Sequence, residues 1–254
     1  QGYRNFTQTS DDEVIALLRR ARADVAHTAA AGFGDPPPLR DEEVRVDAGG
    51  VTVTGHLTVP GQPIGVVVFA HGSGRHSPRN RYVADVLRRA GLATLLFDLL
   101  TPDEELDRAN VFDIGLLAER LVGVTQWLAA QPETAALPVG YFGASTGAGA
   151  ALVAAADPRV QVAAVVSRGG RPDLAGQALG KVRAPTLLIV GGRDRFVLEL
   201  NHQARAAIPA VCEIAVIPGA THLFEEPGAL DQVAELARDW FTDHLSRTGA
   251  STRP

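Results

Sequence analysis

A serine between two glycines, where an apolar run meets a helix of small residues, is the first candidate for chemistry. Ser145 lies within the segment GASTG at 143–147, after the apolar residues 139–142. A tight strand-to-helix turn of this kind lifts the hydroxyl above the edge of a sheet and tolerates only small neighbours. The helix that starts there aims its partial positive charge at a reacting carbonyl. We interpret Ser145 as a nucleophile, and the alternative is a serine that caps a helix in a glycine-rich turn.

A serine hydroxyl needs a base, and a histidine and an aspartate stand at suitable places further along the chain. His222 follows the last apolar run, 211–217, and Asp194 follows the run 186–190 and a glycine turn. Loops at the carboxyl ends of strands are where α/β sheets hold their sites. We predict that His222 is the base and that Asp194 orients it. The alternatives are a surface histidine, an aspartate that caps a helix, and Asp98 as the acid.

Backbone donors for an oxyanion are expected in two loops. The amide of Thr146 follows the nucleophile, and the segment HGSG at 71–74 follows an apolar run and has glycines that allow a substrate to come close to the backbone. We predict Thr146 and Ser73 as the oxyanion hole, with Gly74 as the second choice. His71 is expected to shape this loop rather than to act as a base.

Basic residues gather after two predicted strands. One group, Arg75, His76 and Arg79, follows HGSG, and the other lies in SRGGR at 167–171. Arginine side chains suit carboxylate or phosphate groups, so we hypothesise an anionic or polyoxygenated substrate. The alternative is that the arginines pair with acidic residues and hold loops together. The acids available for such pairs are Asp98, Asp103, Glu104 and Asp173, and the candidate substrate-binding residues are His71, Gly74, Arg75, His76 and Arg168.

Strands and helices alternate from residue 64 onward. Continuous apolar runs predict strands buried on both faces, and their alternation with helices predicts a doubly wound, mostly parallel α/β domain. Residues 44–46 and 51–59 predict an N-terminal antiparallel hairpin around a Gly-rich turn, so the sheet is expected to be mixed. The predicted strands are 66–70, 92–97, 139–142, 162–166, 186–190 and 211–217, and the predicted helices are 78–90, 114–130, 146–156, 198–207 and 230–245.

The chain divides at one proline-rich segment. Residues 11–30 have the acidic first turn and the apolar spacing of a helix, and GDPPP at 34–38 ends it. We predict a helical extension and Pro-rich linker over 1–38, an α/β domain over 39–247 and a disordered tail over 248–254.

The composition limits which classes of partner and cofactor are expected. A net charge of -5 over 254 residues gives no electrostatic case for nucleic acid or an anionic membrane as a partner. No apolar run approaches the ~18 residues of a membrane span. The one cysteine excludes an internal disulfide and fits a cytoplasmic protein. The sequence has no Cys/His cluster or phosphate loop that would point to a metal or an organic cofactor.

The motifs above, with GATHLF at 219–224, resemble the dienelactone hydrolase-like branch of the α/β-hydrolases over about residues 64–245. The chain is similar to a bacterial subgroup in which the hydrolase follows a phosphoribosyltransferase-like domain, and residues 3–20 resemble the tail of that domain. The resemblance implies an α/β-hydrolase fold, a catalytic triad and an upstream domain. The chain is then a fragment or a stand-alone relative, and the missing initiator methionine agrees with this.

Two departures from the family pattern bear on the chemistry. Dienelactone hydrolases carry cysteine where this chain has Ser145, which indicates ordinary ester hydrolysis, and the loop between Gly74 and Arg75 is shorter than in the subgroup. We expect a serine esterase or lactonase that acts on a small molecule through an acyl-enzyme. The rivals are amide, thioester or macrolide lactone cleavage by the same residues, and a catalytically silent binding or regulatory module. The sequence does not indicate an oligomeric state.

Overall fold

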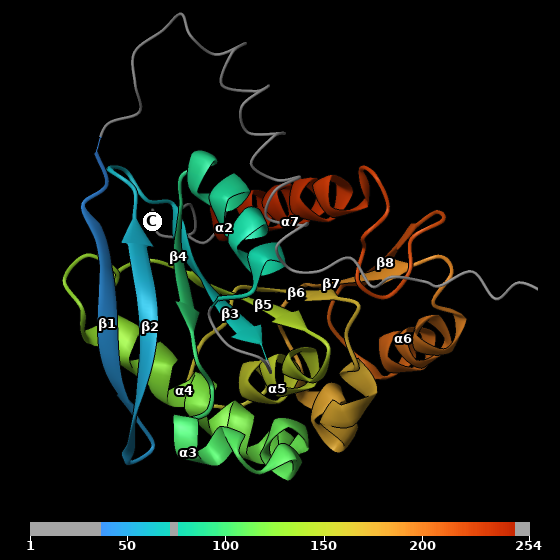
Figure 1. Cartoon of the computed structure of the whole chain (residues 1–254), viewed down its shortest axis with the longest axis horizontal. Helices are drawn as coiled ribbons and strands as arrows, with labels where there is room; N and C mark the ends of the chain where they lie inside the picture. Colours follow the sequence, from blue (N-terminus) through green and yellow to red (C-terminus); the bar gives the residue numbers. More distant parts are fainter. Residues whose placement is uncertain (1–36, 72–75, 247–254) are drawn as a thin grey trace, which may run out of the picture. The chain divides into compact units, whose positions relative to one another are not determined.

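An eight-stranded sheet is the centre of the fold. The computed structural model describes residues 37–71 and 76–246. The strand order is β1-β2-β4-β3-β5-β6-β7-β8 (Figure 1), in which β2 pairs antiparallel with β1 and β4 and all other pairs are parallel. The mixed sheet with an N-terminal hairpin is confirmed. The strands are β1 (Arg40–Ala48), β2 (Val51–Val59), β3 (Gly65–His71), β4 (Leu92–Phe97), β5 (Val139–Ala144), β6 (Ala164–Arg168), β7 (Thr186–Gly191) and β8 (Cys212–Ile217).

The hairpin of β1 and β2 closes through a two-residue turn. Gly49 and Gly50 have φ angles of 67° and 83°, which an L side chain rarely adopts. Two consecutive positive φ angles give the turn whose twist matches antiparallel strands, so the Gly-Gly pair fixes the register of the hairpin. Inward-facing Val44, Val46 and Ala48 are buried, which makes β1 part of the core.

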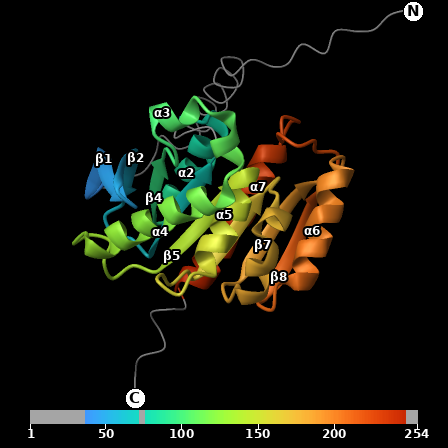
Figure 2. The same ribbon diagram turned by 90° about the horizontal axis from the view of Figure 1, so that it is seen from below.

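Helices cover both faces of the sheet. Helices α2 and α7 lie together on one face, and α4, α5 and α6 lie on the other, where Figure 2 shows them in front of the strands. Because β3 to β8 all run parallel, their carboxyl ends meet at one edge of the sheet. The helices are α2 (Pro78–Arg89), α3 (Pro102–Glu105), α4 (Ile114–Ala130), α5 (Thr146–Ala155), α6 (Arg195–Ala207) and α7 (Ala229–Ser246), with the 3₁₀ segments η1 (Arg108–Phe112) and η2 (Pro172–Lys181).

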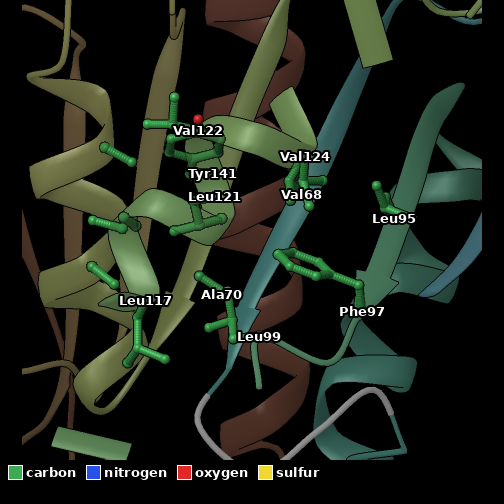
Figure 3. Packing of buried hydrophobic residues seen from close by; sticks show 14 of the residues in the cluster. Val68, Ala70, Leu95, Phe97, Leu99, Leu117, Leu121, Val122, Val124 and Tyr141 are labelled. Carbon is green, nitrogen blue, oxygen red and sulfur yellow. The ribbon is translucent and has the colours of Figure 1, made fainter. Parts of the chain in front are cut away.

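Each face of the sheet has its own apolar core. On the α4 and α5 face, Tyr141 is fully buried, and its hydroxyl lies 2.5 Å from Thr125 Oγ1. On the other face, the rings of Phe69 and Phe142 lie 5.0 Å apart beneath α2 and α7. Burial on both faces explains why the central strands are continuously apolar. Figure 3 shows the first core, in which Leu117, Leu121, Val122 and Val124 of α4 lie over Val68, Ala70, Leu95 and Phe97 of the sheet.

The observed elements differ from the predicted ones mainly at their ends. The strand predicted at 162–166 is β6, which begins and ends two residues later, and α6 begins at Arg195 rather than at 198. The short segments α3, η1 and η2 were not predicted, because a few turns of helix carry little periodicity. The predicted helix at 11–30 and the tail at 248–254 lie outside the described residues, so the domain boundaries stay predictions.

Candidate active site

Ser145 stands at the turn between β5 and α5. Its φ and ψ angles of 51° and -123° lie outside the ordinary regions for an L-residue, a strain of about 1–3 kcal/mol that close packing must hold in place. A Cβ added to Gly147 would overlap the carbonyl oxygen of Ala70, and one added to Gly143 would lie 2.6 Å from Ala148 Cα. The two glycines therefore let α5 approach β3 and β5 closely and leave the Ser145 side chain exposed at the sheet edge.

His222 lies in the connection between β8 and α7. Within this connection Glu226 accepts hydrogen bonds from the backbone N–H and the hydroxyl of Thr221, at 3.0 and 2.5 Å. Phe224 has a φ of 56° and is buried, so its ring anchors the connection next to the imidazole. The backbone N–H of Arg193 donates to Ala220 at 3.0 Å and ties this connection to the turn that carries Asp194.

Hydrogen bonds link Ser145, His222 and Asp194 in one chain. Ser145 Oγ lies 3.3 Å from His222 Nε2, and His222 Nδ1 lies 2.8 Å from Asp194 Oδ2. Asp194 occupies the N-cap position of α6, but its side chain makes no capping hydrogen bond within the described chain. Its carboxylate bonds to the imidazole of His222 instead, so the alternative of a helix-capping aspartate does not explain the position of this side chain. The same contact favours Asp194 over Asp98 as the acid.

This arrangement has the parts that proton transfer from a serine requires. A carboxylate at Nδ1 fixes the tautomer in which Nε2 is the acceptor, and Nε2 faces the hydroxyl. The Asp194 side chain is 16% exposed while that of His222 is 43% exposed. The acid is thus shielded and the base is open to a substrate or to water, as general acid–base chemistry needs.

The predicted oxyanion donors are described in part. Thr146 is the first residue of α5 and is buried, and its N–H belongs to the first turn, where helix N–H groups have no partner within the helix. Ser73, Gly74 and Arg75 lie outside the described residues. Their roles stay predictions.

His71 and Arg168 end β3 and β6, the two strands on either side of β5, and so flank the turn that carries Ser145. Both pair in register with Ala144, the residue before Ser145. Burial, together with the positive charges of Arg168 and Arg79, lowers the pKa of His71 to about 4, so this imidazole is neutral near pH 7. Burial, and then the charge of Arg79, lowers the pKa of Arg168 to about 10. His71 therefore adds no positive charge of its own to the cluster at neutral pH.

Other basic residues of the predicted groups are engaged with neighbours. His76 Nδ1 lies 2.7 Å from a guanidinium nitrogen of Arg81, and Arg79 forms a 3.1 Å ion pair with Glu225. Arg171 forms a 2.8 Å ion pair with Asp173, one of the acids considered for such pairing. Arg79 and Arg171 thus pair with carboxylates, which favours the alternative that these arginines hold loops together, whereas Arg168 donates to the amide oxygen of Asn80.

Sequence reasoning missed two buried asparagines beside the site. Asn80 in α2 is 2% exposed and accepts a 3.5 Å hydrogen bond from Arg168, and Asn201 in α6 is fully buried and donates to Gly170. For Asn201 the sequence offers one weak signal, an amide in the interior of an otherwise amphipathic helix, whereas Asn80 lies in the first turn of α2, where polar residues are common.

The described residues offer no cluster of three or more His, Cys, Asp or Glu side chains that could hold a metal ion. In the same part of the chain, no helix combines the length and the apolarity that a membrane crossing requires.

Solved structures identify the architecture as an α/β-hydrolase fold. Est1E from Butyrivibrio proteoclasticus has a TM-score of 0.66 at 17% identity, covering 80% of this chain and 99% of its own. The esterase domain of a Rhodothermus marinus protein has a TM-score of 0.65 at 20% identity, covering 82% of this chain and all of its own. At these identities the likeness concerns the fold alone.

The family follows from closer matches. The model of the Dienelactone hydrolase family matches residues 53–247, and the chain belongs to this family. A dienelactone hydrolase from Anabaena variabilis is 57% identical with a TM-score of 0.79, over 83% of this chain and 100% of its own. Family and fold are therefore those of ester-type hydrolases.

Longer relatives carry the same region. Proteins from two strains of Mycobacterium tuberculosis are each 73% identical over 253 residues, which is 99% of this chain and 57% of the relative. Both are provisionally named phosphoribosyl transferases. The chain thus spans little more than half the length of these relatives, and the remaining part leaves room for a further domain.

Proposed function

We propose that the chain is a serine hydrolase that cleaves a carboxylic ester or lactone through an acyl-enzyme. The observation that carries this proposal is the hydrogen-bond chain from Ser145 Oγ through the imidazole of His222 to Asp194 Oδ2, with contacts of 3.3 and 2.8 Å. Membership of the dienelactone hydrolase family supports the same class of reaction.

The geometry suggests the following steps. His222 Nε2 takes the proton of the Ser145 hydroxyl as its oxygen attacks the carbonyl carbon, and Asp194 stabilises the imidazolium that forms. The amide of Thr146, at the positive end of α5, binds the oxyanion, and we assign the second donor to Ser73. The imidazolium gives its proton to the leaving alcohol. A water that His222 then deprotonates releases the acid from Ser145.

The substrate is a small-molecule ester or lactone, and no metal or organic cofactor takes part in these steps. We retain Arg168, His71, His76, Gly74 and Arg75 as candidates for contact with the substrate. Two ion pairs argue against a strongly cationic pocket, because each neutralises an arginine: Arg79 pairs with Glu225, and Arg171 pairs with Asp173. A preference for anionic over neutral esters is therefore not part of the proposal.

The name of the longer relatives refers to a different chemistry. We propose that phosphoribosyl transfer, if those proteins perform it, belongs to an additional domain upstream of the region matched here. The matched region supplies the hydrolase, which acts as a cytoplasmic enzyme.

A fluorophosphonate probe tests the proposal, because it reacts only with an activated serine. We expect rapid labelling of the wild type, none of Ser145→Ala, and a rate about 10³–10⁴-fold lower for Asp194→Asn, in which the imidazole loses its preferred tautomer. Turnover of a panel of p-nitrophenyl esters and lactones should fall in parallel.

The control is Asp173→Asn, which changes a carboxylate that pairs with Arg171 and should keep the labelling rate within about twofold. Folded wild-type protein that is neither labelled nor active on the panel would contradict the proposal and favour a binding module.

A further inference from the structure

A short loop at the end of β6 touches the elements that carry all three residues of the proposed mechanism. The loop comprises residues 168–171 and so includes Arg168, the last residue of β6. The backbone N–H of Arg171 donates to the carbonyl oxygen of Ser145 at 3.0 Å. The backbone N–H of Gly169 donates to Ile189 at 2.8 Å, in the strand that leads to Asp194. The 168–171 loop is thus bonded both to the nucleophile and to the strand of the acid.

The same loop packs against the imidazole. Gly169 has a φ of 52°, and a Cβ added there would lie 3.1 Å from the carbonyl oxygen and 3.6 Å from Cε1 of His222. A Cβ added to Gly170 would overlap Ser167 Oγ and Ala148 Cβ. The backbone of the loop therefore fills the space between His222 and α5, and a shift of the loop must move one of them.

Two buried asparagines from opposite helical layers hold the loop. From α6, Asn201 Nδ2 donates to the carbonyl oxygen of Gly170 at 3.2 Å and to that of Val197 at 2.7 Å. From α2, on the other face of the sheet, Asn80 Oδ1 accepts from Arg168 at 3.5 Å. Helix α6 is also the helix that Asp194 precedes, so Asn201 links the acid-bearing element to the loop.

We propose that the 168–171 loop is a positioning element, and that Asn201 and Asn80 clamp it so that His222 Nε2 stays within reach of Ser145 Oγ. The expected loss of rate rests on the proposed function, whereas the expected change in the distance from Ser145 Oγ to His222 Nε2 does not. Without the Asn201 amide, the buried carbonyl of Gly170 has no donor from α6, and the loop shifts to find one. A displacement of about 1 Å between reacting groups costs up to about a hundredfold in rate.

The test compares Asn201→Ala with Thr125→Ala. Thr125 is a matched control, because its hydroxyl is buried in α4 and bonded to Leu121 O and Tyr141 Oη but does not touch the loop. On a neutral ester we expect Asn201→Ala to lower kcat about tenfold to a hundredfold with KM within about twofold, and to slow fluorophosphonate labelling by the same factor. Thr125→Ala should lose similar thermal stability but keep kcat within about twofold.

Two further variants keep the test decisive if Asn201→Ala does not fold. Asn201→Ser keeps a hydroxyl that can bond the carbonyl of Val197 within the helix but cannot reach Gly170, so it should show the same loss of kcat. Asn80→Ala releases the clamp from the other layer and should show a smaller loss in the same direction.

Crystal structures of the wild type and the variants provide a readout that needs no activity. We expect the distance from Ser145 Oγ to His222 Nε2 to exceed 3.5 Å in the Asn201 variants and to stay near 3.3 Å in Thr125→Ala. An unchanged distance, or a loss of kcat no larger than that of Thr125→Ala, overturns the inference. A wild type without hydrolysis or labelling refutes the proposed function instead, and the distances still decide the role of the loop.

Discussion

At the scale of single residues, His71 shows how burial sets charge near the site. It ends β3 and pairs in register with Ala144. The positive charges of Arg168 and Arg79 lie close enough to lower its pKa. Burial and these charges lower its pKa from 6.5 to about 4. In the unfolded chain the same imidazole returns to its ordinary pKa, so the two states bind different numbers of protons between about pH 4 and 6.5.

This difference makes a prediction about stability and pH. The unfolded state binds more protons in that range, so His71 stabilises the fold fully above about pH 6.5 and loses this contribution as the pH falls toward 4. Between pH 7.5 and pH 5 the loss is about 2 kcal/mol. Urea unfolding of the wild type and of His71→Gln at both pH values measures it. A variant with the same pH dependence as the wild type would show that His71 is not the cause.

The sequence indicated some residues of the site clearly and gave little sign of others. Ser145 could be found because its turn demands glycines at fixed places, and His222 and Asp194 because each follows an apolar run. Asn201 could not be found in this way, since its role depends on a carbonyl 31 positions earlier in the chain, which only the fold brings near. The charged state of His71 likewise depends on neighbours from other elements.

At the scale of elements, the packing of α5 on the sheet decides where Ser145 stands. The helix is built from small residues, and nearly all of them are buried. Gly147 contacts the backbone of β3 so closely that an added Cβ would overlap Ala70 O and lie 2.7 Å from Ala70 C. The backbone of a central strand cannot move aside as the end of a flexible side chain can.

We therefore predict that Gly147→Ala lowers the free energy of unfolding by about 1–3 kcal/mol and slows probe labelling, because α5 must retreat and take Ser145 with it. The matched control is Gly180→Ala in η2, where an added Cβ meets no atom within 4 Å. It should stay within about 0.5 kcal/mol of the wild type. Equal effects of the two variants in urea unfolding would contradict the packing argument.

Elements with long apolar runs were predictable, and those built from mixed residues were less so. The centre of β6 could be found from its valines, but its end could not, because Ser167 and Arg168 resemble loop residues until their burial is known. The start of α6 escaped prediction because Arg195 and Phe196 are exposed and give no core-facing signal.

At the scale of the whole molecule, residues 37–246 contain both cores and all three residues of the proposed mechanism. The first strand belongs to this unit, since Val44, Val46 and Ala48 pack into the core on the α4 side. The Anabaena variabilis relative is covered over 100% of its chain by 83% of this one.

A chain that starts at residue 37 should therefore keep its Tm within about 2 °C and its labelling rate within about twofold of the full chain. A chain that starts at residue 51 lacks β1, leaves the backbone edge of β2 without its partner strand, and should not fold cooperatively. Differential scanning calorimetry of the three chains distinguishes these cases. A large loss of Tm on removal of residues 1–36, which lie within the predicted extension and linker over 1–38, would contradict the predicted division of the chain.

The separation of Ser145 and His222 by 77 positions has a consequence for biosynthesis. A ribosome that adds about 5–20 residues per second needs roughly 4–15 s to pass from one codon to the other. During that interval the nascent polypeptide contains Ser145 but not His222, so the proposed proton transfer has no base. Under the proposed mechanism, reactivity requires the connection that follows β8, so translation itself delays its onset.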